Sequence, residues 1–196
     1  EDNSSALHGR DITTDAKLAL DKDGNFLALE ADLTANMGAY LSAGGPNAST
    51  NAASTAMGGV YNIPCVFMSS KGVFTNTTPV DAYRGAGKPE ANFIIERLID
   101  IAASQFNFDP VELRLKNIIS NLPHNTAFGL QIDSGKFKEN IEKASNYIDY
   151  KGFFKRREAS REKGFLRGIG FGCFLETSRG SPVEGAEIRF AESGRI

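Results

Sequence analysis

The sequence predicts an α+β fold in which β-hairpins pack against helices. Strand-like patterns of alternating apolar residues dominate the first 76 residues, and four helical patterns follow within residues 89–163. Because strands and helices come in separate runs instead of alternating, this class is favoured over a doubly wound parallel sheet. A chain of 196 residues can bury a substantial core, as one large domain or two small ones.

Composition and charge narrow the possible partners. The chain is 41% hydrophobic and 23% charged, which is typical of soluble globular proteins. Its net charge of −2 argues against nucleic acid or an anionic membrane surface as the main partner. No signal peptide is recognisable, and no apolar run approaches the roughly 18 residues that a membrane span needs. We therefore expect a cytoplasmic protein without a membrane span.

The cysteines and histidines form no pattern typical of a metal site. Cys65 and Cys173 lie far apart, which fits neither a metal-ligand motif nor a disulfide framework. Both lie in apolar, strand-like runs, so we predict buried free thiols in a reducing compartment. His8 and His124 show no metal-ligand spacing. No metal-ligating residue is therefore predicted.

The first two strands predict a β-hairpin. Residues 13–20 alternate as a strand, and residues 21–25, DKDGN, form a turn cluster whose glycine favours a positive φ. Residues 26–41 alternate again. Their predicted apolar face comprises Leu27, Leu29, Ala31 and Leu33.

Two alternatives stay open for residues 43–59, AGGPNASTNAASTAMGG. The residues are small and polar, as in a flexible loop, but small residues also allow a segment to press against another chain or domain. Residues 63–76 return to a strand pattern, with a bend predicted at Gly72.

Two helices have clear start signals. Pro89 suits the first turn of a helix, where its missing N–H costs nothing. The predicted apolar face of this helix comprises Ala91, Ile94, Ile95, Leu98, Ile99 and Ala102. The sequence DPVE, which starts at Asp109, resembles a capping box and predicts a second helix that ends near Ile119.

The second half contains two more helical patterns and a return to strands. Residues 135–148 should bury Phe137, Ile141, Ala144 and Ile148, whereas residues 150–163 contain KRREASREK and predict a solvated helix. Residues 167–178 predict a glycine-interrupted strand, and residues 187–196 predict a hairpin that turns at 192–194 and then stops. Because such a hairpin lacks its second strand, and the chain begins without methionine, we expect an internal fragment of a longer chain.

The loop YRGAGK, residues 83–88, is the strongest candidate for a binding site. It precedes a predicted helix, whose first N–H groups are unpaired and carry partial positive charge. The glycines would let the backbone approach a ligand closely, and Arg84 would add a fork of donors. An ordinary tight turn would look similar, and both the P-loop and the dinucleotide fingerprints are absent. The residues alone indicate an oxyanion-binding or cofactor-contacting loop.

A family resemblance runs through residues 75–100, TNTTPVDAYRGAGKPEANFIIERLID. This segment resembles the signature of the molybdenum-binding large subunit of the xanthine dehydrogenase, aldehyde oxidase and carbon monoxide dehydrogenase family. Other stretches resemble the family in the same order, including YNIPCVF, FDPVELRLKNII, RGIGFGCFLETS and EGAEIRF. The resemblance implies that residues 1–196 are part of a molybdopterin-binding domain, incomplete at both ends. Residues 1–165 would hold the cofactor loop, and residues 166–196 would begin the following sheet region.

The resemblance also implies site residues. The molybdenum centre of a pterin cofactor would be lined by Tyr83, Arg84, Gly85, Ala86 and Gly87. The arginine would help to position the centre, and the helix behind the loop would be a rigid support. Members that oxidise carbon monoxide carry, at the position of Gly85, a cysteine of a copper-containing site, so glycine implies a hydroxylase-like relative. At the position of Lys88, many relatives have arginine. Lysine retains the positive charge of arginine but loses its bidentate geometry.

The implied activity is an oxidoreductase that hydroxylates aldehydes, N-heterocycles or a similar small substrate with oxygen from water. The cofactor would be molybdenum with molybdopterin dinucleotide, and electrons would pass to iron–sulfur clusters and FAD on other domains or subunits. The general base of the family is a glutamate in a Gly-x-Gly-Glu motif, which this sequence lacks. The setting of Glu176 does not match that motif. No catalytic residue is therefore predicted, and the isolated segment should be inactive.

The expected partners follow from this assignment. They are the remainder of the large subunit, iron–sulfur and flavin subunits or domains, a small-molecule substrate and a second large subunit in a homodimer. Two other functions stay open: an assembly module that kept the fold but lost the cofactor, and a phosphate-binding protein that uses the loop and helix start. The intact Arg84 with its glycines favours cofactor binding over the first, and missing further phosphate ligands weaken the second.

Overall fold

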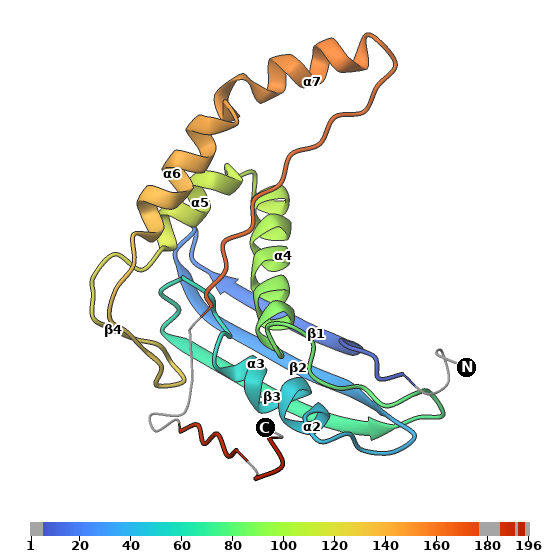
Figure 1. The fold of residues 1–196 in the computed structure, drawn as a ribbon. Coiled ribbons are helices and arrows are strands. Elements are labelled where there is room, and N and C mark those ends of the chain that lie inside the picture. The colour runs from blue at the N-terminus through green and yellow to red at the C-terminus, as the bar shows by residue number, and fades with distance from the viewer. Residues whose placement is uncertain (1–5, 177–184, 191, 195–196) are drawn as a thin grey trace.

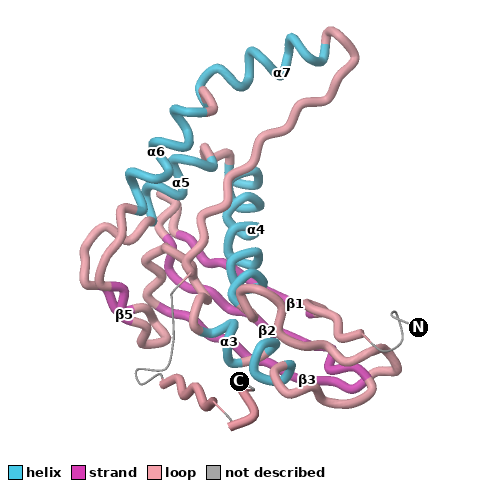
Figure 2. The backbone as a smooth tube through the Cα atoms, in the orientation of Figure 1, coloured by secondary structure: helices cyan, strands magenta, loops and turns pink. Residues whose placement is uncertain are grey.

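The chain folds into a small sheet with helices packed against it, which confirms the predicted α+β class (Figure 1). The structure, a computed structural model, describes residues 6–176, 185–190 and 192–194. One long helix stands against the sheet, and further helices extend away from it before the chain returns along the long helix (Figure 2). Within the described residues, no helix is both long and apolar enough to cross a bilayer.

The first two strands form the predicted antiparallel hairpin. These strands are β1 (Ile12–Leu20) and β2 (Phe26–Gly38). In the turn between them, the Asp21 carboxylate accepts the N–H groups of Asp23 and Asn25, and Gly24 has a φ of 83°. The predicted turn chemistry is therefore confirmed.

The third strand, β3 (Cys65–Phe74), lies parallel to β2 and completes the sheet order β1-β2-β3. A parallel pair needs a crossover, and residues 39–64 provide it. The prediction of a flexible loop at 43–59 is wrong, because this crossover contains the short helices α2 (Gly45–Ser49) and α3 (Asn51–Ser54). It packs within its own chain and buries Ala53, Ala56 and Met57.

Two side chains predicted to be buried on this sheet are exposed. Leu27 is 48% exposed because the register shifts where Leu20 pairs with Phe26, and Phe26 takes the inward position instead. Leu29, Ala31 and Leu33 are buried as predicted. Cys65 is exposed because it lies on the outer face of β3, an edge strand whose exposure alternates along its length.

The long helix α4 (Lys88–Phe106) supplies most of the core opposite the sheet. Five of its six predicted apolar residues are buried and Leu98 is partly buried, which confirms the predicted face. The next helix, α5 (Pro110–Asn117), begins where predicted, because the Asp109 carboxylate accepts the N–H groups of Val111 and Glu112.

Beyond α5 the chain leaves the sheet. A small ribbon of β4 (His124–Asn125) and β5 (Gln131–Ile132) precedes α6 (Phe137–Tyr147), a 3₁₀ turn (Tyr150–Gly152) and α7 (Phe153–Arg161). Helix α7 is mostly exposed, as predicted for its charged sequence. The predicted burial of Ala144 and Ile148 is wrong, because α6 extends beyond the body of the molecule and only its first turns are covered (Figure 1).

Residues 165–176, which we call the strap, run in an extended conformation without the predicted strand pairing. Side chains hold the strap instead of a neighbouring strand. Arg114 donates to the Phe171 carbonyl at 3.1 Å. The Leu175 N–H donates to the Asn92 amide oxygen at 3.4 Å, and the Asn92 amide nitrogen donates to the Leu175 carbonyl at 3.5 Å. Residues 185–190 also form no strand, although residues 192–194 turn as predicted. The other predicted strand residues, 177–178 and 195–196, lie outside the described residues.

Candidate cofactor-contacting site

The loop Tyr83–Gly87 has one well-defined shape. Gly85, Ala86 and Gly87 have φ values of 95°, 39° and 81°, so three consecutive residues lie in the left-handed region. The Ala86 N–H donates to the Tyr83 carbonyl at 2.8 Å, and the Lys88 N–H donates to the Gly85 carbonyl at 3.1 Å. Two overlapping turns therefore lead directly into α4.

The glycines are required by packing within the chain. A Cβ atom on Gly87 would lie 2.3 Å from the Ala48 carbonyl oxygen, and one on Gly85 would lie 2.6 Å from the Pro89 side chain. The sequence suggested a different role, namely open backbone for a ligand. The structure shows that these two positions also fit the loop against α2 and α3 and against the first turn of α4.

Arg84 projects from this loop beside a cavity. Its side chain is exposed and has no hydrogen bond or ion pair with any described residue. The cavity, which we call the loop–strap cavity, has a volume of about 830 Å³ and lies between the loop, α4 and the strap. It is lined by Arg84, Gly85, Pro89, Asn92, Phe93, Glu96, Gly172, Cys173, Phe174 and Glu176. Of the five predicted site residues, Arg84 and Gly85 line this cavity, whereas Tyr83, Ala86 and Gly87 do not.

Besides the Arg84 guanidinium, backbone N–H groups of the loop are unpaired hydrogen-bond donors. Within the described part of the chain, the N–H groups of Arg84, Gly85 and Gly87 have no hydrogen-bond acceptor. They lie at the N-terminus of α4, where the helix dipole favours negative charge. The loop is therefore rich in donors, and its chemistry suits an acceptor-rich or anionic group.

An ionic cluster around the buried Arg114 adjoins the cavity through Glu96. The Arg114 side chain is fully buried and contacts the carboxylates of Glu96 and Asp100, each at 2.8 Å. The Tyr61 hydroxyl donates to the other Glu96 oxygen at 2.5 Å. Burial raises the pKa of Tyr61 well above its ordinary value, and the Glu96 charge raises it further, so Tyr61 stays a donor.

Arg114 keeps its proton despite its burial. Burial by itself lowers the pKa of Arg114, but the charge of Glu96 and the hydrogen bond to Asp100 more than offset that effect, and the pKa is raised. The sequence analysis missed this cluster. A signal was present, because Asn92, Glu96 and Asp100 recur every four residues and form a polar stripe on one side of the helix.

Two further cavity residues are tied to their surroundings. Burial, and then the nearby Glu96 charge, raise the pKa of the Cys173 thiol, which therefore stays neutral. Glu176 forms an ion pair with Lys88 at 2.8 Å, which joins the end of the strap to the first residue of α4. The Lys88 side chain thus has its partner within the chain.

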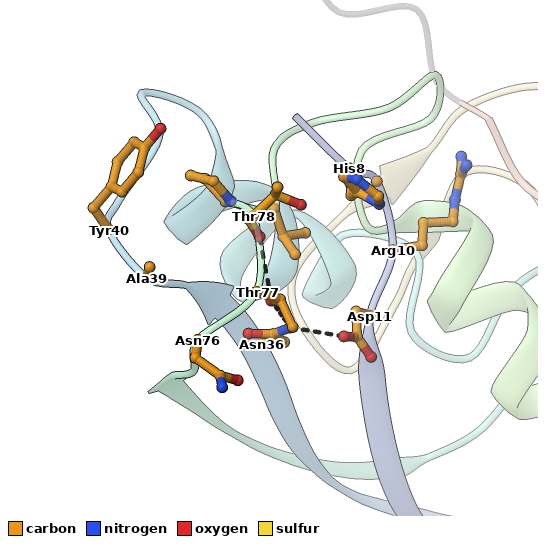
Figure 3. Close-up of a pocket in the computed structure, with 12 residues that line it drawn as sticks. His8, Arg10, Asp11, Asn36, Ala39, Tyr40, Asn76, Thr77 and Thr78 are labelled. Atoms are coloured by element: carbon orange, nitrogen blue, oxygen red, sulfur yellow. Dashed lines mark hydrogen bonds between the residues drawn. The ribbon is translucent and has the colours of Figure 1, made fainter. Parts of the chain in front are cut away.

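A second, more polar cavity of about 640 Å³ lies near the N-terminus (Figure 3). Its central group is the Asn36 amide, which donates to Asp11 at 2.7 Å and to Thr77 at 2.9 Å. The Asn36 oxygen accepts from Gly38 and Thr75, so all its hydrogen-bonding positions are satisfied within the chain. The Asn36 amide is therefore not available to a ligand in this cavity.

Comparison with known proteins identifies the family. Residues 1–118, more than half of the chain, match the sequence model of the molybdopterin cofactor-binding domain, and the chain belongs to this family. The match includes the loop Tyr83–Gly87, α4 and α5. The strap lies beyond it.

The relatives are large subunits of oxidoreductases. Over 96% of its length, the chain is 32% identical to the carbon monoxide dehydrogenase large chain of Hydrogenophaga pseudoflava. Over 94% of its length, it is 35% identical to the xanthine dehydrogenase molybdenum-binding subunit of Escherichia coli O157:H7. It covers 24% and 25% of these proteins, and so spans about a quarter of their length.

Solved structures confirm the fold. Quinoline 2-oxidoreductase from Pseudomonas putida 86 superposes with a TM-score of 0.76 at 30% identity, over 82% of this chain and 21% of that one. The carbon monoxide dehydrogenase from Oligotropha carboxidovorans superposes with a TM-score of 0.73 at 28% identity. The fold of about four fifths of this chain thus recurs in these two oxidoreductases.

Proposed function

We propose that this chain supplies one wall of the molybdenum–pterin site in the large subunit of a molybdenum hydroxylase. The observation that carries the proposal is the unpaired Arg84 guanidinium at a cavity that Gly85 also lines, together with the N–H groups of both residues, which have no acceptor among the described residues. The family match adds that the loop belongs to a domain type that binds molybdopterin. The described residues fit such a group, because Arg84 and the loop N–H groups are hydrogen-bond donors that would hold an anionic, acceptor-rich cofactor.

Each loop residue has a proposed role. Arg84 donates to the cofactor and offsets its negative charge, while Gly85 presents its N–H group. Tyr83, Ala86 and Gly87 set the shape of the loop that holds these donors in place. When bound, the molybdenum–pterin group supplies the oxidation chemistry, with water as the source of oxygen.

The remaining cavity wall suits a small planar substrate. Phe93 and Phe174 line the cavity and are 71% and 72% exposed, so they offer apolar surface to an aldehyde or N-heterocycle. The cavity carboxylates are engaged, since Glu96 binds Arg114 and Glu176 binds Lys88. We therefore propose that the general base comes from another part of the full-length subunit.

Hydroxylation is favoured over carbon monoxide oxidation. A soft copper ion needs a thiolate, and Gly85 provides none. Cys173 lines the same cavity, but it lies on the strap and not at the position of Gly85.

The remaining cofactors and partners are proposed by analogy with the relatives. One relative is named as the gamma subunit of the 6-hydroxypseudooxynicotine dehydrogenase complex of Paenarthrobacter nicotinovorans, and so belongs to an assembly. We propose that the pterin is a dinucleotide, that iron–sulfur and FAD domains or subunits accept the electrons, and that two large subunits form a homodimer. The division at residue 165 into a cofactor-loop region and a following sheet region stays a prediction.

The test is Arg84→Ala in the natural full-length subunit, with its partners present. We expect substrate turnover per chain to fall by about 100-fold, as when a single preorganised donor is removed from an active site. Turnover and molybdenum content should be measured on the same preparations. Arg157→Ala is the control, because Arg157 is an exposed arginine on α7 without a side-chain partner among the described residues.

The alternative is a non-catalytic assembly module. Its support is the exposed apolar surface of Phe93 and Phe174, which would suit a protein partner equally well. If Arg84→Ala changes neither turnover nor molybdenum content by more than about twofold relative to the control, this alternative replaces the proposed function.

A further inference from the structure

We propose that Arg10 is a positioning residue that fixes the loop Tyr83–Gly87 and, through it, the guanidinium of Arg84. The inference rests on the proposed function, because it assigns the loop a task that depends on its shape. Arg10 does not line the loop–strap cavity. It would therefore act on the site through other residues.

Three contacts join Arg10 to the loop and to the start of α4. Its guanidinium donates to the Arg84 carbonyl, lies over the Tyr83 ring with 4.8 Å to the centroid, and pairs with Glu90 at 3.6 Å. The loop is thereby held at two successive residues and tied to the first turn of α4. In Figure 3, the Arg10 side chain points away from the polar cluster around Asn36.

The backbone around Arg10 is shaped for this contact. Arg10 has a φ of 55°, a left-handed conformation that glycine or asparagine adopts more readily than arginine. The preceding residue packs tightly, since a Cβ on Gly9 would lie 2.6 Å from the Tyr83 Cβ. His8 is paired with the segment before the loop, through bonds to Pro79 and Asp81 at 3.0 and 2.7 Å. An arginine at a strained position, with its side chain in contact with both the loop and α4, indicates a functional constraint.

Glu90 makes Arg10 difficult to replace without compensation. One Glu90 oxygen faces Arg10, and the other is buried without a hydrogen-bond partner among the described residues. Removal of Arg10 alone would leave this carboxylate without its cation, which could unfold the region. Arg10→Met combined with Glu90→Gln removes both charges and separates loop positioning from this effect. Arg10→Lys retains the charge but loses the planar fork.

Hydrogen–deuterium exchange of the full-length subunit tests the proposal without relying on activity. In Arg10→Met/Glu90→Gln, the Ala86 and Lys88 amides, whose bonds close the two turns of the loop, should exchange about tenfold faster. Arg10→Lys should give an intermediate increase. Amides of α5 should not change. Arg97→Met is the matched control, as an exposed arginine on α4 without a partner among the described residues, and it should leave the loop amides unchanged.

A double-mutant comparison links the loop to Arg84. If Arg10 acts through Arg84, the loss of turnover per molybdenum in Arg10→Met/Glu90→Gln should largely disappear in an Arg84→Ala background. Unchanged loop exchange, or losses that are additive, would overturn the role of Arg10 while Arg84→Ala still upholds the proposed function. If Arg84→Ala has no effect on turnover or molybdenum content, both proposals fail together.

Discussion

At the scale of single residues, Arg114 has the most unusual environment. Its guanidinium is fully removed from solvent, yet it donates to Glu96, Asp100 and the Phe171 carbonyl. A buried charge of this kind is tolerated only when its donors are satisfied, and it becomes costly when one partner is lost. Because Glu96 also lines the loop–strap cavity and Arg114 also binds the Phe171 carbonyl, the cluster connects the cavity wall to the strap.

Replacing Arg114 should therefore strongly destabilise the folded protein. We expect Arg114→Met to lower the free energy of unfolding by about 3–5 kcal/mol, because the Glu96 carboxylate stays buried without its cation. Urea denaturation followed by circular dichroism measures this change. Arg157→Met, on the exposed face of α7, should stay within about 0.5 kcal/mol of the unmodified protein. A loss below about 1 kcal/mol for Arg114→Met would show that the cluster is not structurally important.

At the scale of elements, the site depends on the junction between the loop and α4. Gly87 is the N-cap residue of the helix, and its left-handed conformation turns the chain from the loop into the first helical turn. The same residue sits against the backbone of the α2–α3 crossover. The junction thus links the sheet crossover, the loop and the helix, and it requires a residue without a side chain.

Gly87→Ala tests this junction. The alanine Cβ would lie 2.3 Å from the Ala48 carbonyl oxygen, in addition to the strain of a φ of 81°. Gly129→Ala is a matched control, since Gly129 has a φ of 78° but open space around it. We expect about 1 kcal/mol of destabilisation for Gly129→Ala from strain alone, and about 1–3 kcal/mol more for Gly87→Ala from overpacking. Equal losses in urea denaturation would argue against the tight packing of Gly87.

At the scale of the whole molecule, the chain presents surfaces that a complete binding site would cover. The cavity residues Phe93 and Phe174 and the strap residue Leu166 are largely exposed. The relatives are about four times as long as this chain. These exposed residues support the proposal that the chain provides one wall of a larger site.

The 196-residue chain alone should not hold the cofactor. We expect that, purified from a host that makes molybdopterin, it contains far less than one molybdenum per chain and does not oxidise aldehydes or N-heterocycles. The physical reason is that donors on a single wall leave most of the cofactor in water. Elemental analysis by mass spectrometry measures the metal, with the full-length subunit as the control. Near-stoichiometric molybdenum in the short chain would contradict the one-wall proposal.

Much of the local structure could be predicted from the sequence. The β1–β2 hairpin, the apolar face of α4 and the Asp109 cap depend on turn residues, on periodicity and on capping, which act within a few residues of each other. The loop before α4 was also recognisable, from its glycines and its position. The family resemblance, confirmed by comparison, added the cofactor class.

Other features escaped sequence analysis because distant contacts create them. Leu27 turned outward because the hairpin register shifts, and the strap formed no strand because no described strand lies beside it. The roles of Arg114 and Arg10 arise from partners that lie 18 and 74 positions away. Spacing marks Glu96 and Asp100 as part of a polar stripe on α4, but it does not identify the distant arginine that pairs with them.

The sequence by itself therefore determined the α+β class, the order of the main elements and the loop that carries Arg84. Only the tertiary structure decided that β3 runs parallel to β2, that the small-residue segment forms helices against its own chain, and that the loop glycines serve internal packing. The physical reason is the distance along the chain over which each effect acts. Propensity, capping and turn chemistry act over a few residues, whereas burial, charge pairing and close backbone contact depend on which distant segments meet.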